Sequence, residues 1–261
     1  MTLKVWLNGY NGRMGQEICE ATESSEGLLI EGGSGHLYLK NQFQEKQDYS
    51  SEELAENLEK VDLIIDFSNV DGNASLLKAI HLTKSKKAIL IGTTGLSKEI
   101  RSQWKKMCTE GGHSILFAPN TSLGVLLTMK LSQQMASILQ PKGFDIEITE
   151  SHHRRKVDAP SGTAKFLADR ICDMVPLEIV THREGARRES EIGVFALRGG
   201  SVFGEHEVRF MGDFEELSIS HRALSRSLFA KGAIILGKWI SDQEKGRHYG
   251  LTDVSLEDIS S

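Results

Sequence analysis

Several protein classes are excluded by what this sequence of 261 residues has little of. Its three cysteines, Cys19, Cys108 and Cys172, lie far apart and form no Cys-x-x-Cys pair, which argues against a disulfide framework or a zinc site and fits a reducing compartment. No apolar run approaches roughly 18 residues, so we expect no membrane span. The short apolar run at residues 3–7 is too short for a signal peptide. We therefore expect a cytoplasmic protein.

The sequence also has no excess of positive charge. The formal net charge is −5, which argues against nucleic acid as a partner, so any attraction for an anionic ligand must be local. The hydrophobic fraction of 39% and the charged fraction of 26% are ordinary for a globular protein. This length suits one large domain or two modest ones.

Strands and helices alternate through the first half of the chain. We expect strands at residues 3–7, 28–30, 62–67, 88–91 and 114–117, and helices ending near residue 23 and spanning residues 52–59, 74–83 and 99–108. This alternation predicts an α/β domain of Rossmann-like character, with a parallel sheet and right-handed crossovers.

The pattern changes after residue 122. We expect helices at residues 123–139, 161–174 and 225–240, strands at residues 144–151, 194–197, 207–210 and 217–221, a hairpin turn at residues 211–213 and a mobile loop at residues 183–191. Strands joined by turns indicate an α+β domain with a mixed, mostly antiparallel sheet that is half exposed.

A glycine turn follows the first strand. Gly9, Gly12 and Gly15 give the spacing that lets a chain turn tightly, approach a pyrophosphate and pack a helix close to its strand, although Asn11 occupies the middle position of the usual pattern. A plain strand-to-helix turn is the alternative. The position between the first strand and the first helix favours a dinucleotide, whose phosphates the helix N-terminus would hold.

The end of the second strand bears on the choice of cofactor. A carboxylate is expected there to bind the ribose hydroxyls of NADH, but Glu31 comes too early and the segment reads Gly-Ser-Gly-His. Arg13, Ser34 and His36 could contact a 2′-phosphate instead, or His36 could be a solvated loop histidine. The sequence favours NADPH and leaves NADH open.

Residues 150–164 form a basic loop that leads into a helix. Its five consecutive side chains at residues 152–156 are all basic or titratable, and Ser161 is a good N-cap for the helix that follows. A helix start with Lys156 nearby suits a carboxylate, and a histidine beside it can donate a proton. A solvated basic loop or a nucleic-acid patch is the alternative, but no interleaved aromatic residues support the latter.

The motif E-x-H-H-x-x-K-x-D-x-P-S-G-T-A in this loop resembles the signature of the 4-hydroxy-tetrahydrodipicolinate reductase family, also called dihydrodipicolinate reductases. The resemblance spans nearly the whole chain, through the glycine turn and the segments at residues 66–68, 92–95, 118–120, 198–200, 204–206, 221–223, 225–226 and 229–230.

The resemblance implies an NADPH- or NADH-dependent reduction in lysine and diaminopimelate synthesis, by a homotetramer that is built through the sheet of the middle segment. Residues 1–122 and 226–261 would form the dinucleotide-binding domain, and residues 123–225 the substrate and tetramerisation domain. His152 would be the general acid and Lys156 would pair with a substrate carboxylate, with His153, Ser161, Gly162 and Thr163 completing the site. No metal is required. The cofactor would be contacted by Gly9, Asn11, Gly12, Arg13, Met14, Gly15, Ser34, His36, Phe67, Gly92, Thr93, Thr94, Ala118, Pro119 and Asn120.

Two positions depart from the family pattern, and two rival functions stay open. Thr121 stands where the family commonly has an aromatic residue, and Arg155 where it often has histidine. The rivals are a two-domain reductase of another small acid, such as an amino-acid dehydrogenase, and a non-catalytic dinucleotide sensor. The loop from His152 to Thr163 counts against both, because neither needs such a loop.

Overall fold

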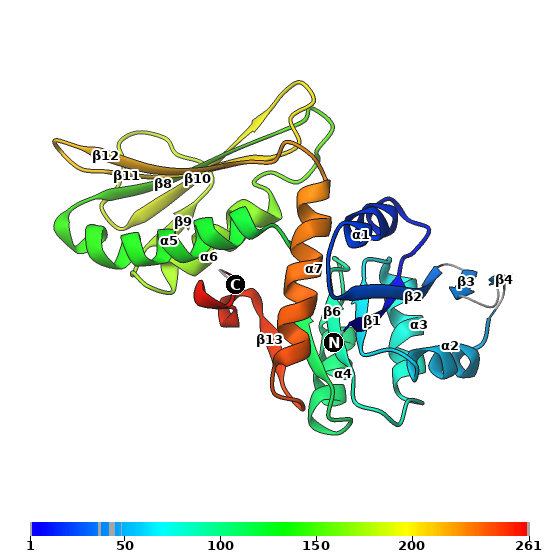
Figure 1. The fold of residues 1–261 in the computed structure, drawn as a ribbon. Coiled ribbons are helices and arrows are strands. Elements are labelled where there is room, and N and C mark those ends of the chain that lie inside the picture. The colour runs from blue at the N-terminus through cyan, green and yellow to red at the C-terminus, as the bar shows by residue number, and fades with distance from the viewer. Residues whose placement is uncertain (1, 36–37, 42–44, 48, 260–261) are drawn as a thin grey trace. The chain divides into compact units, whose positions relative to one another are not determined.

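The computed structural model describes residues 2–35, 38–41, 45–47 and 49–259. The chain forms two compact units, Met1–Ser122 with Ser227–Ser261 (unit 1) and Leu123–Arg226 (unit 2). Each is described by itself (Figure 1).

Unit 1 is built on an eight-stranded sheet of order β13-β7-β6-β5-β1-β2-β3-β4. Its strands are β1 (Leu3–Asn8), β2 (Leu28–Gly35), β3 (Tyr38–Asn41), β4 (Glu45–Gln47), β5 (Leu63–Asp66), β6 (Ala88–Ile91), β7 (Ser114–Phe117) and β13 (His248–Gly250). The pairs from β13 to β2 are parallel, which confirms the predicted parallel sheet. The antiparallel edge strands β3 and β4 and the short β13 were not predicted, and β2 runs five residues beyond the expected residue 30.

Five α-helices cover the two faces of this sheet: α1 (Arg13–Glu23), α2 (Ser51–Leu58), α3 (Val70–Ile80), α4 (Lys98–Thr109) and α7 (Ser227–Asp242). The side chains of Ser50, Asn69 and Ser97 each accept a backbone N–H at the start of a helix, which fixes the first residues of α2, α3 and α4. Two short 3₁₀ turns, η2 (Leu251–Asp253) and η3 (Glu257–Ile259), follow β13.

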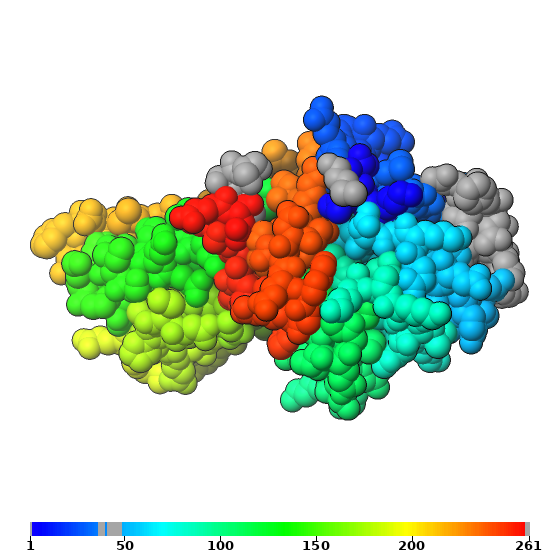
Figure 2. Space-filling view, turned by 60° about the horizontal axis from the view of Figure 1, so that its bottom comes forward, coloured from blue at the N-terminus to red at the C-terminus, as the bar shows by residue number. Residues whose placement is uncertain are grey.

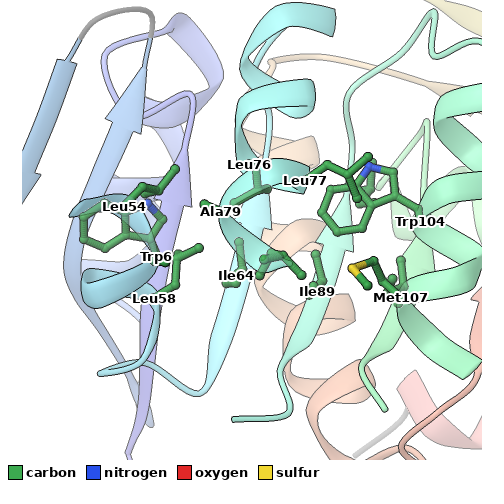
Figure 3. Packing of buried hydrophobic residues seen from close by; sticks show 14 of the residues in the cluster. Trp6, Leu54, Leu58, Ile64, Leu76, Leu77, Ala79, Ile89, Trp104 and Met107 are labelled. Atoms are coloured by element: carbon green, nitrogen blue, oxygen red, sulfur yellow. The ribbon is translucent and has the colours of Figure 1, made fainter. Parts of the chain in front are cut away.

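The hydrophobic core of unit 1 includes a cluster between the sheet and helices α2, α3 and α4 (Figure 3). Trp6 of β1 lies at the α2 side, beside Leu54 and Leu58, and Trp104 of α4 lies at the other end. The indole of Trp104 is fully buried and its N–H donates to the side chain of Asn73 (2.9 Å), so its one polar atom is satisfied.

Helix α7 brings the end of the chain back to unit 1. It packs against α1, β5, β6 and β7, and Figure 2 shows its orange atoms against those of the N-terminal part of this unit. The approach is close at Gly232, where an added Cβ would lie 1.7 Å from the carbonyl oxygen of Thr121. A larger residue at position 232 would therefore push the helix away from the strand ends.

Unit 2 is a five-stranded sheet of order β12-β11-β8-β10-β9. Its elements are α5 (Leu123–Leu139), η1 (Gln140–Lys142), β8 (Asp145–His152), α6 (Gly162–Cys172), β9 (Glu178–Val180), β10 (Glu191–Arg198), β11 (Glu205–Met211) and β12 (Glu216–Arg222). β11 pairs antiparallel with β8 and β12, while β10 pairs parallel with β8 and β9, so the sheet is mixed as expected. Both α-helices lie on one face, and within this fully described unit the other face carries no helix (Figure 1).

The prediction of a mobile loop at residues 183–191 is wrong at its last residue, because Glu191 is the first residue of β10 and is 3% exposed. Ion pairs anchor the segment to the sheet. Arg183 pairs with Glu191 (2.5 Å) and with Glu147 of β8 (2.6 Å), and Arg187 pairs with Asp145 (2.7 Å). The polar composition that suggested a solvated loop supplies the charges of this network.

Candidate active site

One face of the unit 2 sheet changes from apolar to polar along β8. Alternate strand residues share a face, and on this face the fully buried Ile146 and Ile148 are followed by Glu150 and His152. β11 follows the same pattern and places His206 directly opposite Glu150. Ionisable groups therefore gather at the carboxyl end of β8, where the apolar face ends.

Glu150 is the centre of this polar group. Its fully buried carboxylate accepts two hydrogen bonds from the Arg198 guanidinium (2.7 and 2.8 Å), one from the Ser161 amide (2.8 Å) and one from Nδ1 of His152 (2.6 Å). Burial raises the pKa of the Glu150 carboxyl, but these hydrogen bonds lower it by more, so that its pKa lies below the usual value. The carboxylate is consequently anionic at neutral pH.

His152 is 9% exposed and is held on two sides. Its Nδ1 faces Glu150, and the ring of His206 meets its ring edge-on at 5.2 Å between centroids. Nε2 lies beside Gly204, where an added Cβ would be 2.9 Å away. The glycine leaves room next to the nitrogen that is not bonded to Glu150.

Helix α6 begins beside these groups. Ser161 caps it, with Oγ accepting from the Ala164 amide (3.2 Å) and lying 3.1 Å from Nε2 of His206. Burial lowers the pKa of His206 to about 4, so this imidazole is neutral at pH 7 and its Nε2 can accept the serine hydroxyl. There is no acidic residue in the first turn of α6, so the positive end of the helix dipole attracts an anion, and the Glu150 carboxylate already accepts from the Ser161 amide there.

The loop between β8 and α6 carries Lys156, whose Nζ forms an ion pair with Asp158 (2.8 Å). The hydrogen bond from Lys156 holds the pKa of the Asp158 carboxyl below its usual range, and the Gly162 amide contributes in the same direction. Asp158 therefore places a carboxylate against the ammonium and the helix start that the sequence assigned to a substrate carboxylate.

The remaining predicted residues of unit 2 lie around this centre. His153 is half-buried, its amide donates to the carbonyl of Val202 (2.8 Å), and its Nδ1 has no hydrogen-bond partner among the described residues. Thr163 is half-buried in the first turn of α6. Arg155, the departure from the family pattern, is exposed.

The glycine turn in unit 1 has the close packing that its spacing predicts. Gly9 has φ +91°, and a Cβ added to it would lie 2.4 Å from the carbonyl oxygen of Phe67. A Cβ added to Gly15 would lie 2.3 Å from the carbonyl oxygen of Gly9. α1 starts at Arg13 with no side-chain cap and no acidic residue in its first turn. Its first backbone N–H groups are the kind of anion site that a pyrophosphate uses.

The glycine turn follows β1, and β5 and then β6 are the next strands on one side of β1 in the sheet. The carboxyl ends of these parallel strands lie at the same edge. Buried Asp66 accepts hydrogen bonds from Asn8 (2.8 Å) and Asn73 (2.7 Å), which fixes the end of β5. The ring of Phe67 covers Gly92, where an added Cβ would lie 2.6 Å from the ring. Of the two threonines that follow Gly92, Thr93 is buried and Thr94 is exposed.

Hydrogen bonds and burial hold the segment that follows β7, residues 118–122. Ala118 is fully buried, and the Asn120 side chain accepts from the Ser122 amide (2.9 Å). Thr121 is 1% exposed, and its hydroxyl donates to the carbonyl of Phe229 (2.7 Å). The threonine that replaces the expected aromatic residue therefore points into unit 1 and fastens the segment to α7.

Ser34 does not fit the phosphate contact that the sequence suggested. Its side chain is fully buried, donates to Asn8 (2.9 Å) and accepts from the Trp6 indole (3.0 Å), because β2 continues through this position. His36 lies outside the described residues. At the end of β2 there is a hollow of about 270 Å³, lined by Gly35, Tyr49, Ser51, Leu54, Asp71, Gly72 and Ser75.

Two kinds of feature are absent from the described residues. No helix in this part of the chain has the length and apolarity needed to cross a bilayer. Among the same residues, no group of three or more His, Cys, Asp or Glu side chains has an arrangement suited to a metal ion.

A parallel sheet with a glycine turn after its first strand, joined to a second unit with a histidine–carboxylate centre, is typical of two-unit oxidoreductases that use a nicotinamide cofactor. Family models for the N-terminus and the C-terminus of dihydrodipicolinate reductase match residues 3–121 and 124–255. The chain belongs to the dihydrodipicolinate reductase family.

Individual relatives agree with this assignment. The chain is 40% identical to the 4-hydroxy-tetrahydrodipicolinate reductase of Aquifex aeolicus, over 97% of this chain and 99% of that one. It is 39% identical to the enzyme of the same name from Methanopyrus kandleri, over 94% of each. Its fold matches dipicolinate-bound dihydrodipicolinate reductase from Paenisporosarcina sp. TG-14, with a TM-score of 0.78 and 23% identity over 98% of this chain and 100% of that one.

Sequence reasoning assigned no role to four side chains of this centre: Glu150, Arg198, His206 and His221. The rings of His206 and His221 stack on adjacent strands, with centroids 6.5 Å apart. One signal could have identified Glu150 and the two histidines, although not Arg198. A histidine or a carboxylate at a position that continues the apolar face of a strand must be buried, and a buried ionisable group needs partners.

Proposed function

We propose that this chain reduces 4-hydroxy-tetrahydrodipicolinate to tetrahydrodipicolinate with NADPH or NADH, the reductive step of lysine and diaminopimelate synthesis. The family supports the reaction, and one observation in this chain carries it: His152, held by Glu150, lies at the same strand end as the anion-binding start of α6 and Lys156. A proton donor and a carboxylate site are what a dicarboxylate imine requires.

Each of the two units would bind a different ligand. Unit 1 would bind the dinucleotide through the turn from Gly9 to Gly15, and unit 2 would bind the substrate. When bound, the reduced nicotinamide supplies a hydride to C4 of the conjugated ring that remains after water leaves. The ring then carries an electron pair in an enamine and needs one proton, which Nε2 of His152 would donate.

The substrate carboxylate would bind at the start of α6. Lys156 would supply a charge-assisted hydrogen bond, and the amides of Gly162 and Thr163 would add two N–H donors at the positive end of the helix. Ser161 and His153 would shape the site. For the carboxylate to bind there, Asp158 must release Lys156.

The proposed cofactor is NADPH, used at least as well as NADH. Exposed Arg13 stands in the first turn of α1, and no carboxylate occupies positions 32–35 at the end of β2. Asp71 lines the hollow at that end, however, and would oppose a 2′-phosphate placed within it. The nicotinamide end would contact Phe67, Gly92–Thr94 and Ala118–Asn120.

We also propose that the chain forms a homotetramer through the bare face of the unit 2 sheet. Leu197 of β10 lies on this face, because its register partner Ser151 faces away from the side of Glu150 and His152, and it is 63% exposed. Phe203, just before β11, is 53% exposed. Exposed apolar patches mark association sites. Light scattering at micromolar concentration should give four times the chain mass, whereas a monomer mass would refute the proposal. A cytoplasmic location stays a prediction from the sequence.

The test of the function uses His152→Gln and Lys156→Ala. Loss of the proton donor should lower kcat by roughly 10²- to 10⁴-fold with a modest change in KM. Loss of the ammonium should lower kcat and also weaken dipicolinate binding by about tenfold or more, the value of a hydrogen bond to a charged group. Dinucleotide binding should survive both changes, because the glycine turn lies in the other unit.

Two matched controls belong to the same unit. His182 is a histidine that is 80% exposed in its side chain, and Lys165 is an exposed lysine of α6. His182→Gln and Lys165→Ala should leave turnover unchanged. Near wild-type turnover in both test variants would show that the loop is a solvated charge cluster, and full activity of His152→Gln alone would remove this histidine as the acid.

A further inference from the structure

We propose that Glu150, clamped by Arg198, is a positioning residue for the proposed reaction. It fixes the ring of His152 with the proton of Nδ1 directed at the carboxylate, which leaves Nε2 to deliver the proton. The same carboxylate ties this ring to the start of α6. The inference rests on the proposed function, since it describes how that function's acid is held.

The two oxygens of Glu150 have different partners. Oε2 accepts from Nδ1 of His152 (2.6 Å) and from Nη1 of Arg198 (2.8 Å). Oε1 accepts from the Ser161 amide (2.8 Å) and from Nη2 of Arg198 (2.7 Å). One oxygen therefore holds the histidine and the other holds the helix start, with the guanidinium bridging both in a two-pronged contact that only arginine provides.

The electrostatics select one state of His152. An anionic carboxylate accepts hydrogen bonds and cannot donate one, so the imidazole nitrogen facing Glu150 must carry a proton. In the neutral ring the free electron pair is then on Nε2, and in the charged ring Nε2 carries the second proton. The carboxylate also stabilises the charged ring, which is the form that can give up a proton as an acid.

The backbone makes this arrangement rigid. β8 and β10 pair in parallel, and His152 and Arg198 are partners in their register. The guanidinium also donates to the carbonyl of Asp158 (2.7 Å), which fastens the loop that carries Lys156. The clamp therefore comes from a strand rather than from a flexible loop.

Other charged and titratable groups belong to the same cluster. His206 lies on β11, and His221 lies next to it on β12. Burial lowers the pKa of both imidazoles, to about 4 for His206, so both are neutral at pH 7. Lys156 on the loop and Arg198 on β10 are cationic. Glu150 is the carboxylate in hydrogen-bond contact with His152 among the described residues.

The test uses Glu150→Gln, with Arg198→Lys as a second variant and Glu147→Gln as the matched control. Glu147 is also a buried glutamate of β8 that pairs with arginines, but it lies on the opposite side of the strand from Glu150. The variants are compared by kcat, by KM, by the pH dependence of kcat/KM, and by dipicolinate affinity in the presence of saturating dinucleotide.

Glu150→Gln should lower kcat on the order of 10²-fold, since replacing the carboxylate behind a catalytic histidine by an amide costs up to about 10⁴-fold elsewhere. The pH dependence of kcat/KM should differ from that of the wild type, because the imidazole has lost its carboxylate partner. Dipicolinate affinity should change less than about threefold, since the amide oxygen still accepts from Ser161. Arg198→Lys should shift the same quantities in the same directions, by roughly tenfold in kcat. Glu147→Gln should resemble the wild type.

Two results would overturn the proposal. One is a wild-type kcat and pH profile in Glu150→Gln. The other is a loss of dipicolinate affinity as large as the loss of kcat in both variants, because Glu150 would then only support the helix start. If Glu150→Gln fails to fold, Arg198→Lys decides the question by the same readouts.

A measurement on the wild type separates this proposal from the proposed function. Long-range ¹H–¹⁵N spectra of histidine-labelled protein, assigned with His152→Gln, should show the neutral His152 ring protonated on Nδ1. Protonation on Nε2 would overturn the proposal even in an active enzyme. An Nδ1 proton in a protein that does not reduce the substrate would leave the positioning intact and refute the function.

Discussion

Asp158→Asn should tighten the binding of dicarboxylates. The Asp158 carboxylate lies 2.8 Å from Nζ of Lys156, and the Gly162 amide also lowers the pKa of this carboxyl. Both donors are proposed to bind the substrate carboxylate, so substrate and Asp158 compete for them. The backbone of residue 158 stays in place in the variant, because its carbonyl accepts from Arg198.

The structure limits the size of the effect. The side chains of Lys156 and Asp158 are 23% and 54% exposed, so solvent screens this ion pair. Pairs of this kind contribute about 0.2–1 kcal/mol, which corresponds to roughly a 1.4- to 5-fold change in Kd. The lost negative charge acts in the same direction, because the ligand is a dianion.

Calorimetric titration with dipicolinate at saturating dinucleotide measures this change. Asp173→Asn is a closely matched control, since Asp173 is paired with Arg170 at 2.8 Å and is 51% exposed, at the far end of α6. Its Kd should equal that of the wild type. Weaker dipicolinate binding by Asp158→Asn would refute the reasoning and show that Asp158 helps to build the site.

Two further predictions concern unit 1. Arg13→Ala should raise KM for NADPH more than for NADH, since a guanidinium–phosphate contact is charge-assisted, and equal effects in steady-state assays would show that Arg13 does not contact the 2′-phosphate. Burial lowers the pKa of His113 to about 4, and its Nδ1 accepts from the Lys87 amide (3.1 Å). The unfolded chain therefore binds this proton from about pH 6.5 downward and the folded chain only below about 4, so stability is lost as the pH falls through this window, by about 2 kcal/mol between pH 7.5 and 5.0. Denaturant titrations should show a smaller loss in His113→Asn, and an unchanged loss would contradict the assignment.

The sequence predicted the elements whose signals are local. Strands such as β6 and β7 are short apolar runs between polar segments, and the structure begins and ends them at the expected residues. Helix α5 also has its expected bounds, Leu123–Leu139. The edge strands β3 and β4 were missed because they have no such run, and β2 was cut short because Gly32, Gly33 and Gly35 resemble a turn. Here tertiary pairing overrides local propensity.

The candidate site divides in the same way. Residues 152–163 stand close together along the chain, so their association could be predicted from one motif. Arg198 could not be placed beside Glu150, because the contact depends on parallel pairing of β8 with β10 through a crossover that contains α6 and β9. The phosphate contact predicted for Ser34 also depended on tertiary structure that the sequence does not show. Its position suggested a ligand contact, but the structure buries its side chain between Asn8 and Trp6.

The position of β8 explains how one carboxylate serves both the histidine and the helix. β8 lies between β10 and β11, so the end of its polar face receives Arg198 from one neighbour and His206 from the other. The chain then leaves β8, makes the loop and returns to Glu150 at Ser161. A carboxamide at position 150 keeps the oxygen that holds α6 and loses the anion that orients His152. An alanine there would lose both, so only the amide variant can separate proton delivery from the binding of the carboxylate.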